Sequence, residues 1–318
     1  MLRRLVALAA TPLLAVPAAA CASGSAAEDP DAVQVVAAFY PLEFLAGRVG
    51  GEHVSVTGLT PPGAEAHDLE LSPSQVAEVS EADLVVHLAG FQPAVDDAVT
   101  AYATGSSLDV ATVVPALDHN DEQAEQAEPD DHADDHGDDD HGDDHGGADP
   151  HVWLDPDRFA TIAGAAAERL AELDPDHAAA YRANADALGA DLATLDAELA
   201  EGLASCERRE IVVSHAAFGY LADRYDLEQI AVTGLSPEDE PTPQQLAGAI
   251  DQAQAHGATT IFFEVLVSPA VAEVIADQVG ATTAVLDPIE GLAPGADDDY
   301  LSLMRSNLTA LREALGCR

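Results

Sequence analysis

The feature that most constrains the fold is a long stretch of helical periodicity, residues 175–203, with an alternation of strands and helices on either side of it. Before it, apolar strand-like runs alternate with helical segments, at 33–39, 53–59 and 84–90. After it, the alternation resumes, with runs at 211–214, 229–232, 260–263 and 284–286. This alternation predicts parallel sheets, and a helix over 175–203 would be roughly 40 Å long at about 1.5 Å per residue. We therefore expect an α/β fold of two parallel-sheet lobes joined by a long interdomain helix.

The lobe boundaries follow from the same pattern. The first lobe is expected over 33–155, the linking helices over 156–205 and the second lobe over 206–318. Asp174 and Pro175 have the residue types of a helix N-cap followed by a proline in the first turn. We expect them to start the long helix.

The first residues have the pattern of an export signal. Two arginines precede an apolar run that ends in small residues and Cys21, which is typical of a signal peptide over 1–20. AAAC at 18–21 resembles a bacterial lipobox, with Ala18 where leucine is usual. We expect Cys21 to carry a lipid that anchors the protein to the outer face of the cell membrane, and residues 21–32 to form a tether. Simple secretion after an A-x-A site is the alternative.

Two other cysteines, Cys206 and Cys317, remain after Cys21. An even pair in an exported protein suggests one disulfide. It would tie the start of the second lobe to the end of the chain. Two free thiols are the alternative.

The charge is strongly negative, at −46, and the chain contains no lysine. There is no basic surface for nucleic acid, so we expect no nucleic-acid partner, whereas cations are natural ligands. Residues 118–149 hold fifteen of the 58 acidic residues and five of the twelve histidines. This Asp/His-rich segment cannot bury a core and is expected to be disordered without metal. Its five histidines are candidate weak metal ligands: His119, His132, His136, His141 and His145.

Metal-capable side chains follow three strands of the second lobe. His215, Glu264 and Asp287 come directly after the runs IVVS, TIFF and AVL. Ligands of parallel sheets bind beyond the carboxyl ends of the strands. In the first lobe, the Pro/Gly-rich loop TPPGAEAHDLELSPSQ presents His67, and DPHVWLDP holds His151 between two Asp-Pro turns that stiffen the backbone.

These residues resemble the metal-binding solute-binding lipoproteins of bacterial ABC importers, the cluster that handles zinc and manganese. The resemblance covers nearly the whole mature chain. It rests on FYPLEFLAGRVGGEHVSV, the loop with His67, DPHVWLDP, SHAAFGYLADRYDL, EPTPQQL, IFFEVLVSP and the final LDP. It implies an extracytoplasmic receptor, expected to be a monomer, that binds a metal ion in the cleft between its lobes and delivers it to a membrane permease.

Carried over by position, the resemblance implies the metal ligands His67, His151, His215 and Asp287. A histidine at 215 is typical of zinc-type members, and three imidazoles with one carboxylate suit Zn²⁺. Some zinc members use a glutamate just before the first histidine, but here that residue is Ala66. Glu264 is expected beside the ligands rather than among them. The Asp/His-rich segment is then interpreted either as an accessory that collects zinc or as a run of charges that keeps the protein soluble.

Three alternatives stay open at this point. Manganese or another divalent metal is the alternative cargo, since ligand type fixes preference weakly. A zinc hydrolase would use the three histidines with Glu264 as base, although no HExxH motif is present. A surface adhesin or metal buffer would act through residues 118–149. The remaining histidines, His53, His87, His177 and His256, are interpreted as structural.

Histidine ligands also predict a pH dependence. They bind metal only when neutral. We expect affinity to fall below about pH 6, near the ordinary histidine pKa of ~6.5.

Overall fold

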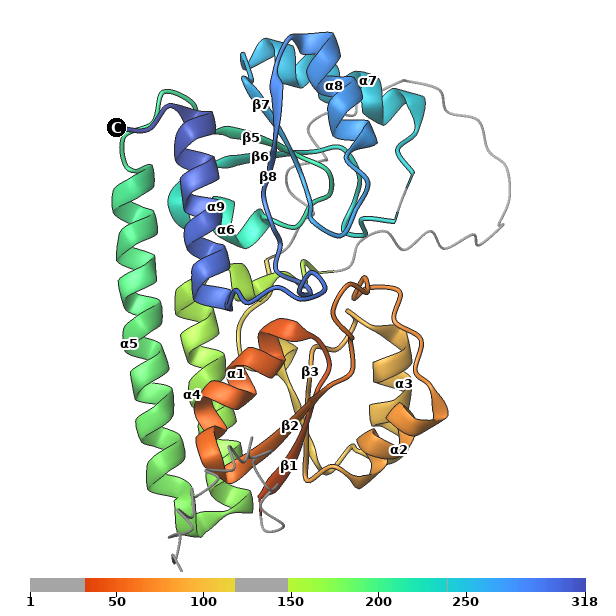
Figure 1. Ribbon diagram of the computed structural model, residues 1–318, viewed down its shortest axis with the longest axis vertical. Coiled ribbons are helices and arrows are strands. Elements are labelled where there is room, and N and C mark those ends of the chain that lie inside the picture. The colour runs from red at the N-terminus through yellow and green to blue at the C-terminus, as the bar shows by residue number, and fades with distance from the viewer. Residues whose placement is uncertain (1–31, 118–147, 239) are drawn as a thin grey trace, which may run out of the picture.

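The computed structural model describes residues 32–117, 148–238 and 240–318. The predicted signal peptide, Cys21, the tether as far as residue 31 and the five histidines of the Asp/His-rich segment lie outside the described residues. The described chain forms two lobes stacked end to end, with two long helices along one side (Figure 1). This is the predicted α/β fold.

The first lobe contains a sheet of four parallel strands in the order β2-β1-β3-β4. The strands are β1 (Val33–Ala37), β2 (Val54–Gly58), β3 (Leu84–His87) and β4 (Ser107–Asp109). The central strands β1 and β3 are almost wholly buried, as expected for a parallel sheet covered on both faces. The edge strand β4 was not predicted, because it has only three residues and no apolar run.

Helices cover both faces of this sheet, with α1 on one side and α2 and α3 on the other (Figure 1). Their bounds are α1 (Tyr40–Gly50), α2 (Pro73–Glu81) and α3 (Pro93–Tyr102), and short 3-10 turns occupy Gly51–His53 and Val110–Thr112. Each α-helix has a proline in its first turn, where no backbone donor is needed. Ser72 and Gln75 form a capping box at α2, which fixes where the His67 loop ends.

The second lobe repeats the arrangement with a parallel sheet in the order β6-β5-β7-β8. Its strands are β5 (Glu210–Val213), β6 (Glu228–Ala231), β7 (Thr260–Phe263) and β8 (Thr282–Val285). Its helices are α6 (Gly219–Tyr225), α7 (Pro243–Ala255), α8 (Ala270–Val279) and α9 (Tyr300–Leu315). The loops after β2 in the first lobe and after β5 and β8 in the second meet between the lobes.

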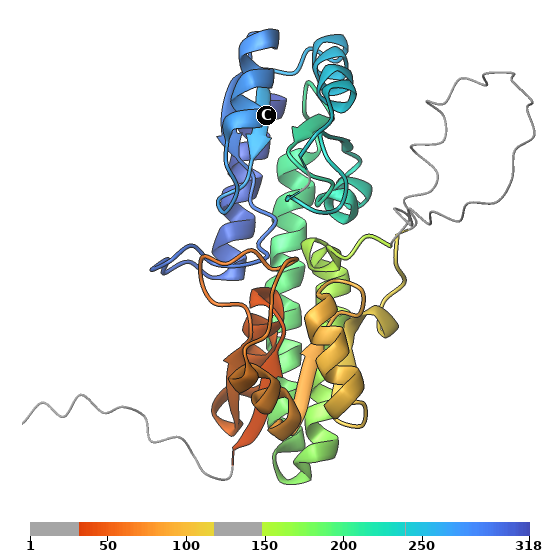
Figure 2. The ribbon, with the colours of Figure 1, turned by 90° about the vertical axis from the view of Figure 1, so that its right-hand side faces the viewer.

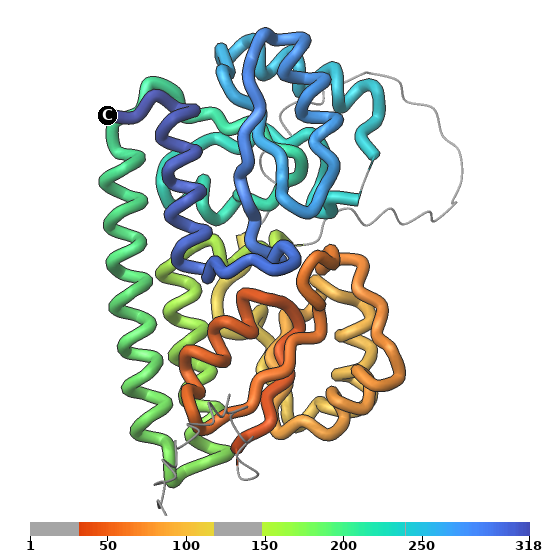
Figure 3. The backbone as a smooth tube through the Cα atoms, viewed as in Figure 1, coloured from red at the N-terminus to blue at the C-terminus, as the bar shows by residue number. Residues whose placement is uncertain are grey.

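The lobes are joined by a helical hairpin. A 3-10 turn (Val152–Leu154) leads into α4 (Pro156–Leu173), and another (Pro175–His177) leads into α5 (Ala178–Leu203). The 26-residue α5 runs beside both lobes, as the two views of the chain show (Figures 2 and 3). It packs on α1 and α4 at one end and on α9 at the other. A rod that contacts both lobes limits how far they can swing apart.

The start of the long helix differs from the prediction. Asp174 makes no capping bond to the helix; its carboxylate accepts hydrogen bonds from Tyr181 Oη at 2.7 Å and pairs with His177 Nδ1 at 2.6 Å. Pro175 begins a 3-10 turn and α5 proper begins at Ala178. Asp155, in contrast, caps α4 by accepting from the backbone of Asp157 and Arg158.

The hydrophobic core continues through both lobes. One cluster of buried side chains joins the first sheet, α4, α5, α9 and part of the second sheet, and a smaller one lies among β7, α7 and α8. No helix in the described ranges is both long and apolar enough to cross a bilayer.

A disulfide joins Cys206, just after α5, to Cys317, just after α9. It closes a loop with a sequence separation of 111 residues. The C-terminus and the adjoining ends of α5 and α9 lie away from the junction of the two lobes (Figure 1). The bond therefore ties the long helix to the C-terminal helix.

Replacing both cysteines with serine should lower the free energy of unfolding by about 2–5 kcal/mol, because the unfolded chain loses a long cross-link. Urea denaturation of the two proteins would measure it. Metal affinity should not change, since the bond is remote from the cleft. An unchanged urea midpoint would contradict this prediction.

Candidate metal centre

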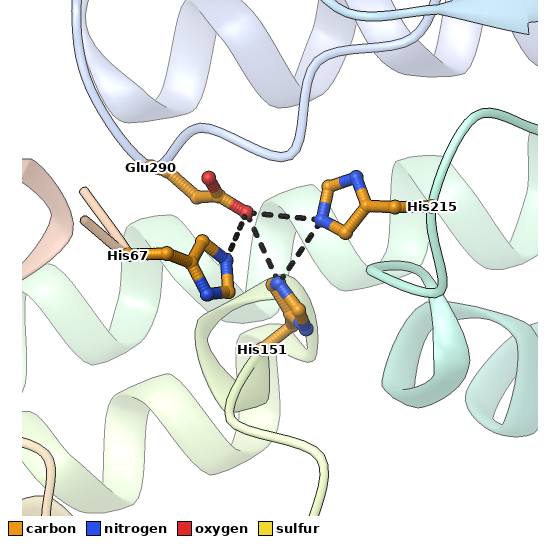
Figure 4. Close-up of side chains that lie close together, drawn as sticks. All are labelled: His67, His151, His215 and Glu290. Atoms are coloured by element: carbon orange, nitrogen blue, oxygen red, sulfur yellow. Dashed lines mark hydrogen bonds and ion pairs between the residues drawn. The ribbon is translucent and has the colours of Figure 1, made fainter. Parts of the chain in front are cut away.

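Four buried or nearly buried side chains converge between the lobes: His67, His151, His215 and Glu290 (Figure 4). One carboxylate oxygen, Glu290 Oε1, lies 3.4 Å from His67 Nε2, 3.0 Å from His151 Nε2 and 3.3 Å from His215 Nε2. The Nε2 atoms of His151 and His215 are 3.4 Å apart. All four candidate ligand atoms lie within 4.8 Å of one another.

This spacing can be tested against zinc geometry. Ligand atoms at about 2.0–2.1 Å from a tetrahedral Zn²⁺ are about 3.3–3.4 Å apart. The four separations given above, 3.0, 3.3, 3.4 and 3.4 Å, fall close to that edge length. The donor set of three imidazoles and one carboxylate is also one that zinc accepts. The residues present therefore fit a tetrahedral zinc ion, with four of the six edges close to the expected length and all six at or below 4.8 Å.

His67 is held by its own loop, between β2 and α2. The Glu65 carboxylate accepts the backbone N–H of His67 at 3.0 Å, and Gln92 Nε2 donates to the carbonyl of Ala66 at 2.9 Å. The loop also touches the other lobe, because the N–H of Gly63 donates to the carbonyl of Leu292 at 2.7 Å. Gly63 has a φ of 87°, and a Cβ there would meet Pro294 at 2.7 Å, so only glycine fits this contact.

His151 is held by Asp149, two residues earlier. The Asp149 carboxylate lies 2.8 Å from His151 Nδ1 and accepts the His151 backbone N–H at 2.9 Å. A carboxylate at Nδ1 keeps the proton there and turns the Nε2 lone pair toward the centre. Asp149 was counted with the Asp/His-rich segment in the sequence analysis, but the structure corrects that boundary: Asp149 is 3% exposed and belongs to the site.

His215 follows β5 and is held in the same way. Glu264, which follows β7, places its Oε1 2.6 Å from His215 Nδ1 and accepts a short hydrogen bond from Ser214 Oγ. Both histidines therefore present Nε2 to the centre and Nδ1 to a buried carboxylate. Such partners orient a ligand ring and raise its basicity.

Glu290 reaches the centre from a turn after β8. Ile289, just before it, has a φ of 61°, which is costly for a β-branched residue and is kept only where the surroundings enforce it. Asp287 enforces it here, because its carboxylate accepts the Ile289 N–H at 2.8 Å. Trp153 adds a second restraint by donating from Nε1 to the Pro288 carbonyl at 2.7 Å. Asn307 fixes Asp287 itself through two hydrogen bonds to its backbone.

The fourth side chain of the group is thus Glu290 rather than the expected Asp287. Asp287 lines a small acidic pocket beside the centre with Glu65, Glu264 and Glu290, while its own carboxylate shapes the turn. Glu290 was not predicted, because it lies in a turn beyond Asp287 and does not directly follow a strand. The available signal was a second carboxylate three residues after Asp287, in a segment with the prolines and glycines of a tight loop.

The other histidines lie elsewhere. The ring of His53 stacks on that of His177 with centroids 3.9 Å apart, and His87 is buried in β3. His256, interpreted as structural, lies 3.1 Å from Glu210. With Glu210 and Glu228 it forms a second, half-exposed group at the amino ends of β5 and β6.

The charges of the centre are strongly coupled. Burial alone would lower the histidine pKa values, but hydrogen bonds outweigh it: Asp149 and Glu290 raise the pKa of His151, and Glu264 and Glu290 raise the pKa of His215 to about 10. Burial would raise the pKa of Glu290, but its three histidine partners hold that pKa well below the usual range. Burial, with repulsion from Glu290 and Glu264, raises the pKa of Asp287 to about 6. Glu290 is therefore an anion at neutral pH that pairs with protonated imidazole until a metal ion replaces the proton.

The family described as zinc-uptake complex component A, periplasmic (ZnuA), matches residues 35–314. The chain belongs to the ZnuA family.

Individual relatives agree with this assignment. The high-affinity zinc uptake system protein ZnuA of Bacillus subtilis (strain 168) is 32% identical over 298 residues, which cover 92% of this chain and 90% of that protein. The zinc-binding protein AdcA of Streptococcus pyogenes serotype M3 is 34% identical over 88% of this chain, which spans only 55% of AdcA. A crystal structure of a ZnuA deletion mutant with zinc bound has a TM-score of 0.74 at 30% identity, covering 90% of this chain and 98% of that chain. ZnuA-family members are solute-binding components of zinc uptake, not enzymes.

The raised histidine pKa values predict proton release on zinc binding. His151 and His215 are protonated below their raised pKa values, so zinc must displace protons, and affinity should rise with pH through the neutral range toward about pH 10 for His215. Zinc affinity should therefore change over a higher pH range than the ordinary histidine pKa suggested. Calorimetry at pH 7.5 in two buffers with different ionisation enthalpies should give about one to two protons released per zinc. Equal heats in both buffers would contradict it.

A pair of isosteric variants separates the roles of the two carboxylates. Glu290→Gln removes the anion that faces all three histidines and should weaken zinc binding by more than ~100-fold, beyond the loss typical of an outer-shell partner. Asp287→Asn keeps an oxygen that can accept the Ile289 N–H, so a loss of less than ~10-fold is expected. Competition with a chromogenic chelator measures both. The reverse order of losses would make Asp287 the ligand.

Proposed function

We propose that this protein is an extracytoplasmic zinc receptor that captures Zn²⁺ between its lobes and delivers it to an ABC-type import permease. The observation that carries the proposal is the shared contact of Glu290 Oε1 with three histidine Nε2 atoms at 3.0–3.4 Å. Its ligands would be His67, His151, His215 and Glu290. The names and zinc-bound structures of the relatives support zinc as the cargo.

The origin of the ligands suits a receptor that must release its cargo. His67 comes from the first lobe, His151 from the start of the linking hairpin, and His215 and Glu290 from the second lobe. A small separation of the lobes would therefore break the coordination set without unfolding either lobe. The long α5 contacts both lobes, so we expect this motion to be modest.

The same geometry disfavours the hydrolase alternative. Catalytic zinc sites combine three protein ligands with an open position for water or substrate. Here four protein side chains close around one point, and Glu264, the proposed base, is hydrogen-bonded to His215 and Ser214. Manganese is disfavoured by the donor set, since it prefers more oxygen ligands than one carboxylate supplies.

The membrane arrangement is part of the proposal. The family is described as periplasmic, and a relative from Streptococcus pneumoniae is named a zinc-binding lipoprotein. We infer that Cys21 carries a lipid and that residues 21–32 tether a monomeric receptor to the outer face of the membrane, close to its permease.

Calorimetry of the mature protein with zinc tests the proposal. One tight site that is lost in His215→Ala supports it. His256→Ala is the matched control, because it removes a histidine from the second group, far from the cleft, and should leave the tight site intact. Tight binding that survives His215→Ala, or that is lost only in His256→Ala, would overturn the assignment.

The Asp/His-rich segment should be dispensable for the tight site. Replacing residues 118–147 with a short Gly/Ser linker, while keeping Asp149 for His151, should remove weak binding and change tight zinc affinity by less than ~3-fold, because all four candidate ligands remain. Titration to saturation would count the sites. A replacement that abolished tight binding would favour a metal buffer acting through this segment.

A further inference from the structure

Tyr220 contacts the described residues on both sides of residues 118–147. Its hydroxyl, on α6 of the second lobe, accepts the backbone N–H of Leu117 at 3.1 Å and donates to the carbonyl of Asp149 at 3.0 Å. Leu117 is the last described residue before the segment, and Asp149 is the second after it. Two backbone groups, one on each side of residues 118–147, are therefore hydrogen-bonded to the same oxygen atom.

The same Asp149 holds a candidate ligand. Its carboxylate contacts both Nδ1 and the backbone N–H of His151, at 2.8 and 2.9 Å. A continuous hydrogen-bonded path thus runs from Leu117 through Tyr220 and Asp149 to His151. Tyr220, Asp149 and His151 are 2%, 3% and 0% exposed, so water cannot readily replace these bonds.

Arg158 packs on the ring of Tyr220. Its guanidinium lies 5.0 Å from the ring centroid and donates to the carbonyl of Pro115, just before Leu117. Arg158 belongs to α4, so the ring is held between the linking hairpin and the second lobe. The hydroxyl position is therefore set in part by this packing of α4 against α6.

We propose that Tyr220 is a positioning residue of the zinc site, which aligns His151 by fixing Asp149. The inference rests on the proposed zinc-binding function. It assigns to a second-lobe side chain the alignment of a ligand that lies at the start of the linking hairpin. Loss of the hydroxyl would remove one hydrogen bond that holds the backbone of Asp149 and would leave His151 less well oriented toward zinc.

Tyr220→Phe tests this by removing one oxygen while keeping the ring. Hydrogen-bond partners of metal-ligating histidines typically contribute 10–100-fold to metal affinity. Tyr220 contacts such a partner, Asp149, and not the histidine itself, so we expect about a tenfold loss of zinc affinity. The visible absorption bands of the Co²⁺-loaded protein should also change, because they report ligand orientation. The thermal midpoint of the metal-free protein checks that the fold is retained.

Tyr225→Phe is the matched control. Tyr225 lies on the same helix, and its hydroxyl donates to Asp196 at 2.9 Å, away from His151. It should leave both zinc affinity and the Co²⁺ spectrum unchanged. Asp149→Asn completes a double-mutant cycle. If Tyr220 acts through Asp149, adding Tyr220→Phe to the Asp149→Asn variant should lower the logarithm of zinc affinity by less than about half of the decrease that Tyr220→Phe causes in the wild type.

The outcomes separate the two claims. Reduced affinity, an altered Co²⁺ spectrum and non-additivity with Asp149→Asn support the inference. An unchanged affinity and spectrum in Tyr220→Phe, or an equal change in Tyr225→Phe, would overturn it and leave the receptor function standing. A wild-type protein without a tight zinc site would overturn the proposed function, and this inference with it.

Discussion

A single buried carboxylate organises the space between the lobes. Glu290 Oε1 faces three imidazole nitrogens at 3.0–3.4 Å, and the group belongs to both lobes and the linking hairpin. A buried anion is costly unless it is paired with positive charge. Protons on the histidines supply that charge in the metal-free protein, and a divalent cation supplies it more compactly. The cost of an unpaired Glu290 therefore favours a closed cleft around either protons or metal, and it links zinc capture to pH.

The surrounding carboxylates have a different task. Asp149 and Glu264 each bind the Nδ1 side of a candidate ligand, while Asp287 holds the turn at Ile289. They set ring orientation and backbone shape, and together they make the cleft acidic. The negative field attracts cations in general, whereas the three Nε2 atoms and one oxygen select for a tetrahedral ion with nitrogen preference. Attraction and selection are thus divided between different residues.

Much of this arrangement could be predicted from sequence, because the fold follows hydrophobic periodicity and the histidines stand in stiff motifs. The polar edge strand β4 lacked a periodic signal. Asp149 was predicted to be disordered because it comes at the end of a run of acidic residues and histidines. Glu290 was missed for a geometric reason: a left-handed Ile289 redirects the chain after Asp287, and spacing alone does not reveal a positive φ. Contacts such as Tyr220 with Asp149 join residues 71 positions apart and need the tertiary structure.

Anomalous diffraction at the zinc edge from crystals of the zinc-loaded protein tests the central claim most directly. The account predicts one strong peak inside the group formed by His67, His151, His215 and Glu290, at about 2.0–2.2 Å from each ligand atom. A peak bound to Asp287 in place of Glu290 would contradict the assignment of the fourth ligand. A peak at Glu210, Glu228 and His256, with none in the cleft, would contradict the account as a whole.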